Sequence, residues 1–417
     1  MKKIVVKGPC RLEGEVEISG AKNSIVAILP ATVMVKGKCT VENVPEISDV
    51  EDIIKILRAI GATVVRTGKT VTVDCANVTA NEVPYELAKK MRASYYFLGG
   101  LLGRFHNAKT AMPGGCTIGQ RPIDQHLKGF EALGAKTEFE RGDVHVYCDK
   151  LRGCEIYFDV VSVGATINVM LAATLAEGTT YLNNVAKEPH IVDVANFLNS
   201  MGAHISGAGT DEIKIKGVPE LSGGVYEAIP DQIEAGTFMV AAAATHGDVT
   251  VKNIIPKHME CITRKLSEMN VKVVEFDDSI RIIADKPIKA SHVTTKPYPG
   301  FPTDMHPQIA VLMTQADGDS KITETIWESR FKYVDELRKF GAHIEVIDKV
   351  ARIEGGCDFF ASRVNSCDLR AGAAMVIAGL VASGETEIYD IEYIERGYEN
   401  IIDKFTKLGA KIERIEY

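Results

Sequence analysis

The sequence lacks the features that mark a secreted or membrane protein. It begins MKKIVVKGPC, with only three consecutive apolar residues before Lys7, too few for the core of a secretory signal peptide. The longest uncharged run in the C-terminal third, AGAAMVIAGLVASG, is rich in small residues and too short to span a bilayer. We therefore expect a cytoplasmic protein with no membrane anchor, and we interpret this run as a buried helix.

Cysteine spacing and net charge exclude further classes. The nine cysteines are odd in number and no two are spaced C-x-x-C, which supports neither a disulfide framework nor a zinc site. The formal charge is −8 and there is no basic stripe with interleaved aromatic residues, so we expect no nucleic-acid partner. An anionic substrate would require cations concentrated at one place.

Two sequence motifs recur six times along the 417 residues. One is of the form L-x-x-x-G-A, with Phe for Leu in two copies and Asn-Val for Gly-Ala in another; it ends a helix and leads into an alternating strand, at intervals of 68 to 73 residues. Glycine or asparagine there suits a left-handed helix C-cap; these residues are Gly61, Gly134, Gly202, Asn270, Gly341 and Gly409. The other motif is a small-residue apolar helix, beginning near Lys22, Arg92, Ser162, Gln232, Asp304 and Arg370.

The repeats predict an α/β fold of two domains. Each unit has the order strand, buried helix, strand, amphipathic helix, strand hairpin, which is a βαβαββ-type unit. The small residues of the first helix favour close packing on all sides, so we expect helices inside and sheets outside. The opening strand EGEVEIS matches the strand before each buried helix. We therefore assign residues 22–229 to one domain and 1–21 with 230–417 to the other.

The helix starts predict a site for an anion with several charges. Helix N-termini offer unpaired N–H groups and the positive end of the dipole. Two such faces, opposed across a cleft, would place Lys22, Asn23, Arg92 and Ser162 opposite Asp304 and Arg370. The alternatives are ordinary surface ion pairs and an open solenoid without chemistry. The diversity of the first-turn residues argues against a plain scaffold.

These motifs resemble those of one family, the bacterial UDP-N-acetylglucosamine 1-carboxyvinyltransferases, which are enolpyruvyl transferases. The resemblance runs nearly end to end. It rests on SGAKNS from Ser19, MRASYYFLG from Met91, PGGCTIGQRPIDQH from Pro113, SVGAT from Ser162, PYPGFPTDMHPQ from Pro297, ESRF from Glu328, DLRAGAA from Asp368 and IERGYENI from Ile394.

The resemblance implies an inside-out α/β barrel of two domains with three repeated units each. It implies transfer of the enolpyruvyl group of phosphoenolpyruvate to the 3′-hydroxyl of UDP-N-acetylglucosamine with release of phosphate. This reaction opens peptidoglycan synthesis, on which the cell wall, cell shape and cell division depend. It requires neither a metal nor an organic cofactor.

The family also implies roles for residues. Lys22, Arg121 and Arg396 should hold the phosphate of phosphoenolpyruvate, and Arg330 and Arg370 should lie near its carboxylate, with Asn23 close by. Arginine suits such groups because its planar fork makes bidentate contacts. Asp304 should take the proton from the sugar hydroxyl. Lys22 and Arg396 complete the catalytic set with Asp304 and Cys116.

Cys116 is the proton donor to the methylene carbon in this interpretation. Flanking glycines leave the thiol little packing, and Arg121 should stabilise the thiolate. Such a thiol accounts for a covalent adduct of phosphoenolpyruvate and for the sensitivity to fosfomycin that the family shows with cysteine here. We therefore predict a fosfomycin-sensitive protein. The alternative is an inert, buried cysteine.

The nucleotide-sugar contacts follow the same resemblance. Asn23 and Arg92 should face the sugar and diphosphate, and Asp304 the sugar. The remaining expected contacts are Arg121, Pro122, Ile123, Asp124 and Gln125 along the uridine, Ser162, Val163 and Gly164 at the diphosphate, and Ile326. The sequence departs from the best-known members at Val160, Gln125 and Ser329, which we interpret as a variant that keeps the function.

Two other activities compete with this interpretation. The nearest is that of the sister enzyme, enolpyruvyl-shikimate-phosphate synthase, which shares fold and donor but lacks a cysteine in this loop. A cysteine hydrolase would need a histidine to activate the thiol. His126 and His306 are the nearest candidates by motif, and neither has a local signature.

Overall fold

The computed structural model describes residues 2–112 and 122–416, which form two compact units. Unit 1 contains residues 2–19 and 230–416, and unit 2 contains residues 20–112 and 122–229. Each unit buries its own apolar core. The chain passes from one unit to the other at Ser19–Gly20 and at Ile229–Pro230.

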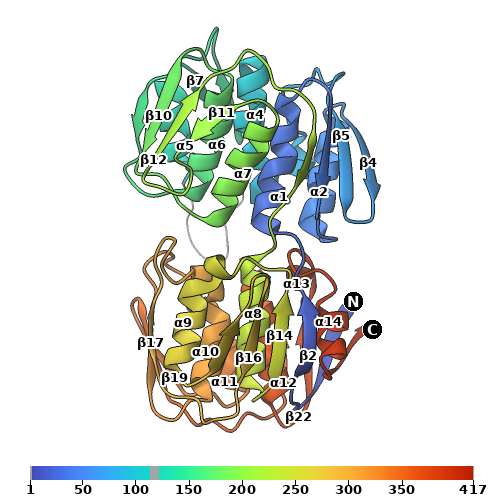
Figure 1. The fold of residues 1–417 in the computed structure, drawn as a ribbon, viewed down its shortest axis with the longest axis vertical. Coiled ribbons are helices and arrows are strands. Elements are labelled where there is room, and N and C mark those ends of the chain that lie inside the picture. Colours follow the sequence, from blue (N-terminus) through green and yellow to red (C-terminus); the bar gives the residue numbers. More distant parts are fainter. Residues whose placement is uncertain (1, 113–121, 417) are drawn as a thin grey trace. The chain divides into compact units, whose positions relative to one another are not determined.

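Three buried helices occupy the interior of each unit, as the small-residue motifs predict (Figure 1). Every residue of α8 after Gln232 is buried, because alanine and glycine let neighbouring backbones approach closely. The prediction of helices inside is therefore confirmed. The inner helices are α1 (Lys22–Ala31), α4 (Tyr96–Phe105) and α6 (Val163–Thr174) in unit 2, and α8 (Gln232–Ala244), α10 (His306–Thr314) and α12 (Leu369–Val381) in unit 1.

The sheets lie outside these helices, as expected. Their strands alternate between buried and exposed residues, for example in EIKIK at Glu212–Lys216. In unit 2 the strand orders are β13 (Val225–Glu227), β3 (Lys38–Glu42), β5 (Thr70–Asp74), β4 (Thr63–Thr67); β6 (Asn107–Ala111), β8 (Asp143–Tyr147), β7 (Lys136–Glu140); and β11 (His204–Ser206), β12 (Glu212–Lys216), β10 (Thr179–Asn183), β9 (Glu155–Tyr157).

The sheets of unit 1 follow the same plan. Their strand orders are β15 (Lys272–Glu275), β16 (Ser279–Ile283), β14 (Asp248–Lys252), β2 (Glu13–Glu17); β17 (His292–Thr294), β18 (Ser320–Thr323), β20 (Val350–Ile353), β19 (Ile344–Ile347); and β21 (Arg363–Asn365), β22 (Gly384–Tyr389), β1 (Lys2–Gly8), β23 (Lys411–Glu416). The sheet of β6, β8 and β7 has three strands instead of four. The segment before α4, which would supply the fourth, pairs with β6 only at a single bridge between Glu82 and Lys109.

A second helix in each repeat buries one face, and the residue directly after its C-cap has a positive φ. The six residues predicted to be left-handed all have φ between +70° and +103°, including Asn270 at +70°. These helices are α2 (Ser48–Ala59), α5 (Asp124–Ala132), α7 (Pro189–Ser200), α9 (Glu260–Glu268), α11 (Val334–Lys339) and α14 (Ile401–Lys407). The described residues also form the short helices α3 (Tyr85–Ala88) and α13 (Glu392–Glu395), and the 3-10 turns η1 (Thr32–Met34), η2 (Arg92–Tyr95), η3 (Pro256–Met259), η4 (Thr303–Met305) and η5 (Arg330–Tyr333).

Two strands are exchanged where the chain passes between the units. β2 precedes α1 of unit 2 but pairs in parallel with β14 of unit 1. β13 precedes α8 of unit 1 but pairs in parallel with β3 of unit 2. Each unit therefore completes one sheet with a strand that leads into a helix of the other unit.

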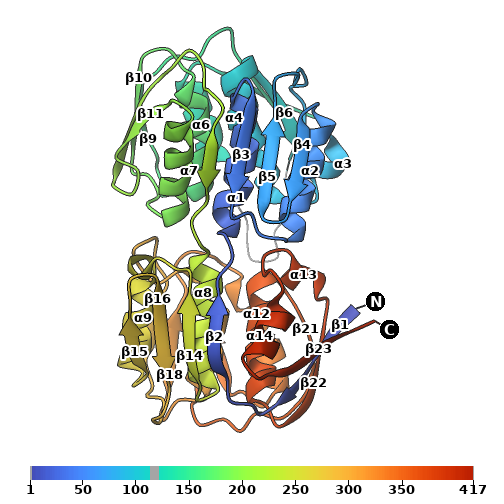
Figure 2. The ribbon, with the colours of Figure 1, turned by 45° about the vertical axis from the view of Figure 1, so that its right-hand side comes forward.

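The N-terminal strand completes the sixth repeat. β1 lies between β22 and β23 and pairs antiparallel with both (Figure 2). In the other repeats this place belongs to a strand of the local hairpin, such as β12 after β11. The chain thus starts within a repeat that its C-terminal segment otherwise forms.

Candidate functional site

Asp304 lies between two buried arginines of unit 1. It belongs to η4, the turn that leads into α10, and its side chain is 30% exposed. Arg330 Nη2 lies 3.4 Å from Asp304 Oδ1, and Arg370 Nε lies 3.2 Å from Oδ2. The two guanidinium groups come from η5 and from the first turn of α12. The structure thus brings together three predicted site residues that lie 26 and 66 positions apart in the sequence.

Arg370 keeps its charge in a buried position. Burial by itself lowers the pKa of Arg370, but the Tyr398 hydroxyl and the Asp304 and Asp231 carboxylates outweigh it and raise the pKa above its ordinary value. The guanidinium also lies over the Tyr398 ring, 5.3 Å from its centre. A buried permanent cation beside a carboxylate suits an anionic ligand.

A buried hydrogen-bond network holds Tyr398, the residue over whose ring Arg370 lies. The Tyr398 hydroxyl lies 2.9 Å from Thr237 Oγ1, and Gln308 Nε2 donates to both oxygens at 3.2 and 3.1 Å. These side chains come from α8, α10 and the segment after α13. The network ties two inner helices to the ring on which Arg370 lies.

Ile326 and Arg396 are the other predicted residues of unit 1. Ile326 is half-buried, and its N–H donates to Glu324 Oε1 at 2.6 Å. Arg396 is half-buried at the C-terminal end of α13, two positions before Tyr398. Glu324 also accepts a hydrogen bond from Thr303, next to Asp304. Thr303 and Tyr398 stand inside two of the quoted motifs without a predicted role, and no motif contains Glu324.

In unit 2, Lys22 opens helix α1, where it was expected. Its Nζ lies 2.9 Å from Asp49 Oδ2, in the first turn of α2. Both side chains are largely buried, with Lys22 14% and Asp49 6% exposed. Asn23 follows in the first turn of α1 and is half-buried. Asp49 is a partner that the sequence analysis missed, because no local signal links it to Lys22.

Arg92 and Gly164 lie around a buried histidine. Arg92 begins η2, and its charge contributes to the low pKa of His126, about 4, for which burial is the larger cause. A Cβ on Gly164 would come within 2.9 Å of His126 Nε2. His126 Nδ1 lies 3.0 Å from Asn168 Nδ2 of α6. Two predicted site residues, Arg92 and Gly164, thus both lie close to the His126 ring.

A serine side chain caps the start of α6. Ser162 is the N-cap, and its hydroxyl accepts a hydrogen bond from Ala165 N at 3.3 Å. Ser162, Val163 and Gly164 are all half-buried. Their main-chain N–H groups therefore belong to the first turn of a helix whose start is partly accessible.

Gln125 lies near this turn and is only 6% exposed. Its Oε1 accepts from Asp159 N at 2.9 Å, and its Nε2 donates to Asp124 and Asp159. Lys128 Nζ lies 2.7 Å from Asp159 Oδ1. Pro122 and Asp124 are exposed and Ile123 is buried. Val160 is 58% exposed.

Cys116 and Arg121 lie outside the described residues. The two histidines weighed as activators of a cysteine hydrolase, His126 and His306, are 6% and 0% exposed. The pKa of His306 lies well below its ordinary value, because of burial and of Arg330. Neither ring presents an accessible nitrogen of ordinary basicity, which disfavours the hydrolase.

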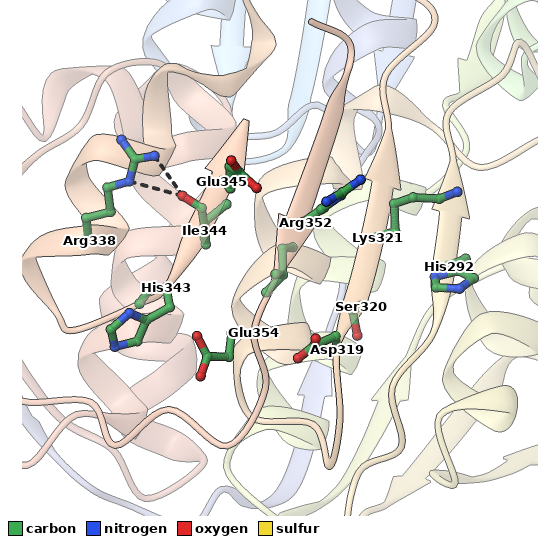
Figure 3. A pocket seen from close by; sticks show the side chains of 12 residues that line it. His292, Asp319, Ser320, Lys321, Arg338, His343, Ile344, Glu345, Arg352 and Glu354 are labelled. Carbon is green, nitrogen blue, oxygen red and sulfur yellow. Dashed lines mark hydrogen bonds between the residues drawn. The ribbon is translucent and has the colours of Figure 1, made fainter. Parts of the chain in front are cut away.

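A hollow of about 790 Å³ lies on the outward face of the sheet of β17, β18, β20 and β19 (Figure 3). A row of paired residues crosses it, His292, Lys321, Arg352 and Glu345. None of the predicted site residues lines it. Its mixed charges are those of a solvated sheet face.

Within residues 2–112 and 122–416, no group of three or more histidine, cysteine, aspartate or glutamate side chains could hold a metal ion. No helix in that part of the chain has both the length and the apolar character needed to cross a membrane.

Curated relatives match the whole chain. A protein of Clostridium botulinum named UDP-N-acetylglucosamine 1-carboxyvinyltransferase is 58% identical over 417 residues, covering all of both chains. A protein of Caldanaerobacter subterraneus subsp. tengcongensis, named UDP-N-acetylglucosamine 1-carboxyvinyltransferase 3, is 55% identical over 415 residues, again covering both chains completely.

Solved structures share the fold. The enolpyruvyl transferase NikO from Streptomyces tendae superposes with a TM-score of 0.90 at 27% identity, over 99% of this chain and 98% of its own. EPSP synthase from Acinetobacter baumannii superposes with a TM-score of 0.78 at 18% identity over both complete chains, which supports the fold alone. The model of the EPSP synthase (3-phosphoshikimate 1-carboxyvinyltransferase) family matches residues 6–405. The chain is an enzyme that belongs to this family of transferases, on the branch of the UDP-N-acetylglucosamine 1-carboxyvinyltransferases.

Proposed function

We propose that the protein transfers the enolpyruvyl group of phosphoenolpyruvate to the 3′-hydroxyl of UDP-N-acetylglucosamine and releases phosphate. The names of relatives that match at 55 to 58% over the full length support this reaction. The main structural support is the position of Asp304, whose carboxylate lies within 3.4 Å of two buried arginines from separate elements. The reaction places the protein in peptidoglycan synthesis, and we propose a cytoplasmic location.

Two steps account for the chemistry. In the addition, Asp304 accepts the proton of the 3′-hydroxyl group. At the same time, the oxygen of that hydroxyl bonds to the phosphoenolpyruvate carbon that bears the phosphate. Cys116 delivers a proton to the methylene carbon, which becomes a methyl group. In the elimination, the Cys116 thiolate takes a proton back from the methyl group, the double bond re-forms as the C–O bond to phosphate breaks, and the phosphate leaves with the proton that Asp304 had accepted.

Different cationic side chains would bind the carboxylate and the phosphate of phosphoenolpyruvate. Arg330 and Arg370 would bind the carboxylate, because buried guanidinium groups make strong charge-assisted hydrogen bonds. Lys22, Arg121 and Arg396 would bind the phosphate, and the neutral Asn23 would contact phosphoenolpyruvate beside them. When phosphoenolpyruvate binds, its negative charge would compete with Asp304 for the arginines, which frees a carboxylate oxygen to accept the proton.

The nucleotide sugar would bind at two groups of residues. In unit 2 these are the expected Asn23, Arg92, the Arg121–Gln125 segment and the capped turn at Ser162, Val163 and Gly164. In unit 1 they are Asp304 and Ile326. We further propose residues 22–229 as one domain and residues 1–21 with 230–417 as the other.

A phosphate-release assay tests the reaction. Purified protein receives phosphoenolpyruvate with either UDP-N-acetylglucosamine or shikimate 3-phosphate, with and without fosfomycin. We expect release only with the nucleotide sugar, loss of activity with fosfomycin, and an adduct mass that Cys116→Ala abolishes. Release with shikimate 3-phosphate alone would assign the sister reaction, to which the family model also corresponds.

A binding experiment separates catalysis from recognition. Asp304→Ala should abolish phosphate release while calorimetric binding of UDP-N-acetylglucosamine stays measurable. Turnover at the wild-type rate in this variant would remove Asp304 from the mechanism.

A further inference from the structure

Glu324 is a completely buried carboxylate that accepts hydrogen bonds from three different segments of unit 1. It follows strand β18 and is 0% exposed. Its Oε1 accepts from Thr295 Oγ1 at 2.9 Å and from the N–H groups of Ile326 and Trp327 at 2.6 and 3.0 Å. Its Oε2 accepts from Thr303 Oγ1 at 2.9 Å. A buried carboxylate with its lone pairs used in this way holds its donors in a fixed geometry.

Thr303 links this carboxylate to the residues proposed for catalysis. Its hydroxyl donates to Glu324, while its carbonyl oxygen accepts from Arg330 Nε and Nη2 at 3.2 and 3.0 Å. The next residue is Asp304, which Arg330 also contacts. Glu324 and Arg330 therefore hold Thr303 from both sides, and the position of Asp304 depends on both.

The same carboxylate shapes the turn that leads to Arg330. The N–H groups of Ile326 and Trp327 converge on one oxygen, which bends the chain just after β18. Ile326 is a proposed nucleotide-sugar contact, and Arg330 begins η5 four residues later. One buried side chain thus fixes two segments that carry proposed groups for both substrates.

We propose that Glu324 is a positioning residue for Asp304, Arg330 and Ile326. It touches neither substrate and acts through Thr303 and the 326–327 turn. The inference rests on the proposed function for its kinetic part. Its structural part concerns the turn alone and has a separate readout.

Matched substitutions test the kinetic part. Glu324→Ala and the nearly isosteric Thr303→Val should each lower kcat by about 10- to 100-fold, because small displacements of a catalytic group are costly. Glu324→Gln and Thr303→Ser should retain kcat within about threefold, since the Gln oxygen still accepts from the turn and its amide donates to the Thr303 hydroxyl. The double variant Glu324→Ala/Thr303→Val should lose little beyond Glu324→Ala, because the two side chains act as one unit.

The only tryptophan of the chain provides the separate readout. Trp327 lies in the turn, so its quenching by acrylamide should increase in Glu324→Ala but stay at the wild-type value in Thr303→Val. Tyr389→Phe is the control, since it removes a hydrogen bond to Glu387 in another sheet of unit 1 and should change neither kcat nor quenching. If Glu324→Ala does not fold, Thr303→Val and Thr303→Ser still decide the kinetic part.

Each outcome has one meaning. Wild-type kcat in Thr303→Val, or an equal loss in Thr303→Val and Tyr389→Phe, would overturn the positioning role. Unchanged quenching in a folded Glu324→Ala would overturn the account of the turn. An inactive wild type would instead refute the proposed function, and the quenching contrast would still test how Glu324 holds the turn.

Discussion

At the scale of the residue, the candidate site consists of charges held by buried partners. Arg330 and Arg370 both contact Asp304, whereas Lys22 pairs with Asp49. Burial strengthens such contacts because water no longer competes for the groups. The sequence predicts which residue types open the helices, but the partner of each charge follows only from the fold.

Arg370 should not tolerate replacement by lysine. Arg370→Lys keeps the charge but loses the planar fork that meets Asp304 and lies over Tyr398, so kcat/KM for phosphoenolpyruvate should fall about 10- to 100-fold. Steady-state kinetics of phosphate release measures this effect. Arg338→Lys is the control, because Arg338 donates to the Ile344 carbonyl and to Asp335 in the same unit and contacts none of the candidate site residues. Equal losses in both variants would contradict the assignment.

His126 should make the protein sensitive to mild acid. Its pKa is about 4 in the folded state because of burial, against 6.5 when exposed, so the unfolded chain binds the proton first as the pH falls. The stability associated with the neutral ring is complete above pH 6.5 and is lost between pH 6.5 and 4. At pH 5 the loss is about 2 kcal/mol.

Thermal unfolding at pH 7.5 and pH 5 measures this contribution. His126→Gln keeps an acceptor for Asn168 and should show a smaller fall in Tm on acidification than the wild type. His204→Gln, at an exposed position, should respond as the wild type does. An identical fall in His126→Gln would assign the acid sensitivity to other groups.

At the scale of the element, glycine decides how closely the inner helices of unit 2 pack. α4 and α6 approach so closely that a Cβ on Gly99 would lie 2.2 Å from the Asn168 carbonyl oxygen. Gly99 N also donates to Asn168 Oδ1 at 2.7 Å. On the same helix, a Cβ on Gly103 would meet nothing closer than 3.4 Å. The composition predicts close packing, but only the structure distinguishes these two glycines.

Alanine substitutions at these two positions of α4 should therefore differ in their effect on stability. Gly99→Ala should lower the free energy of unfolding by roughly 2–4 kcal/mol, because the backbones must separate. Gly103→Ala should be neutral or stabilising by up to about 1 kcal/mol, since alanine favours the helix. Urea unfolding measures both, and equal effects would show that the contact at Gly99 relaxes at no cost.

At the scale of the whole molecule, the last sheet of unit 1 joins the two ends of the chain. β1 separates β22 from β23, and Lys2 pairs with Glu416. Because β1 and β23 are antiparallel and meet at their chain ends, a short turn could connect them as a hairpin. We therefore expect β1 to stabilise the sheet equally well whether it is attached at the N-terminal or at the C-terminal end of the chain.

A rearranged chain tests this account. Deleting residues 1–8 should lower Tm by at least about 5 °C or abolish soluble expression, because β22 and β23 lose their ladder partner. Moving residues 1–8 behind Tyr417 through a short turn should restore Tm to within about 2 °C of the wild type. Differential scanning calorimetry compares the three chains. Failure of the rearranged chain beside a stable deletion would contradict the pairing.

The sequence by itself determined the repeated unit, the inner helices and their starts, and the left-handed residues that end the second helices. These features follow from periodicity and backbone preference, which act over a few residues. The tertiary structure decided the contacts over long separations: Asp49 beside Lys22, Glu324 between Thr303 and the 326–327 turn, the exchange of β2 and β13, and β1 inside the last sheet. Local pattern cannot specify these, because each depends on which buried donor meets which acceptor once the chain is folded.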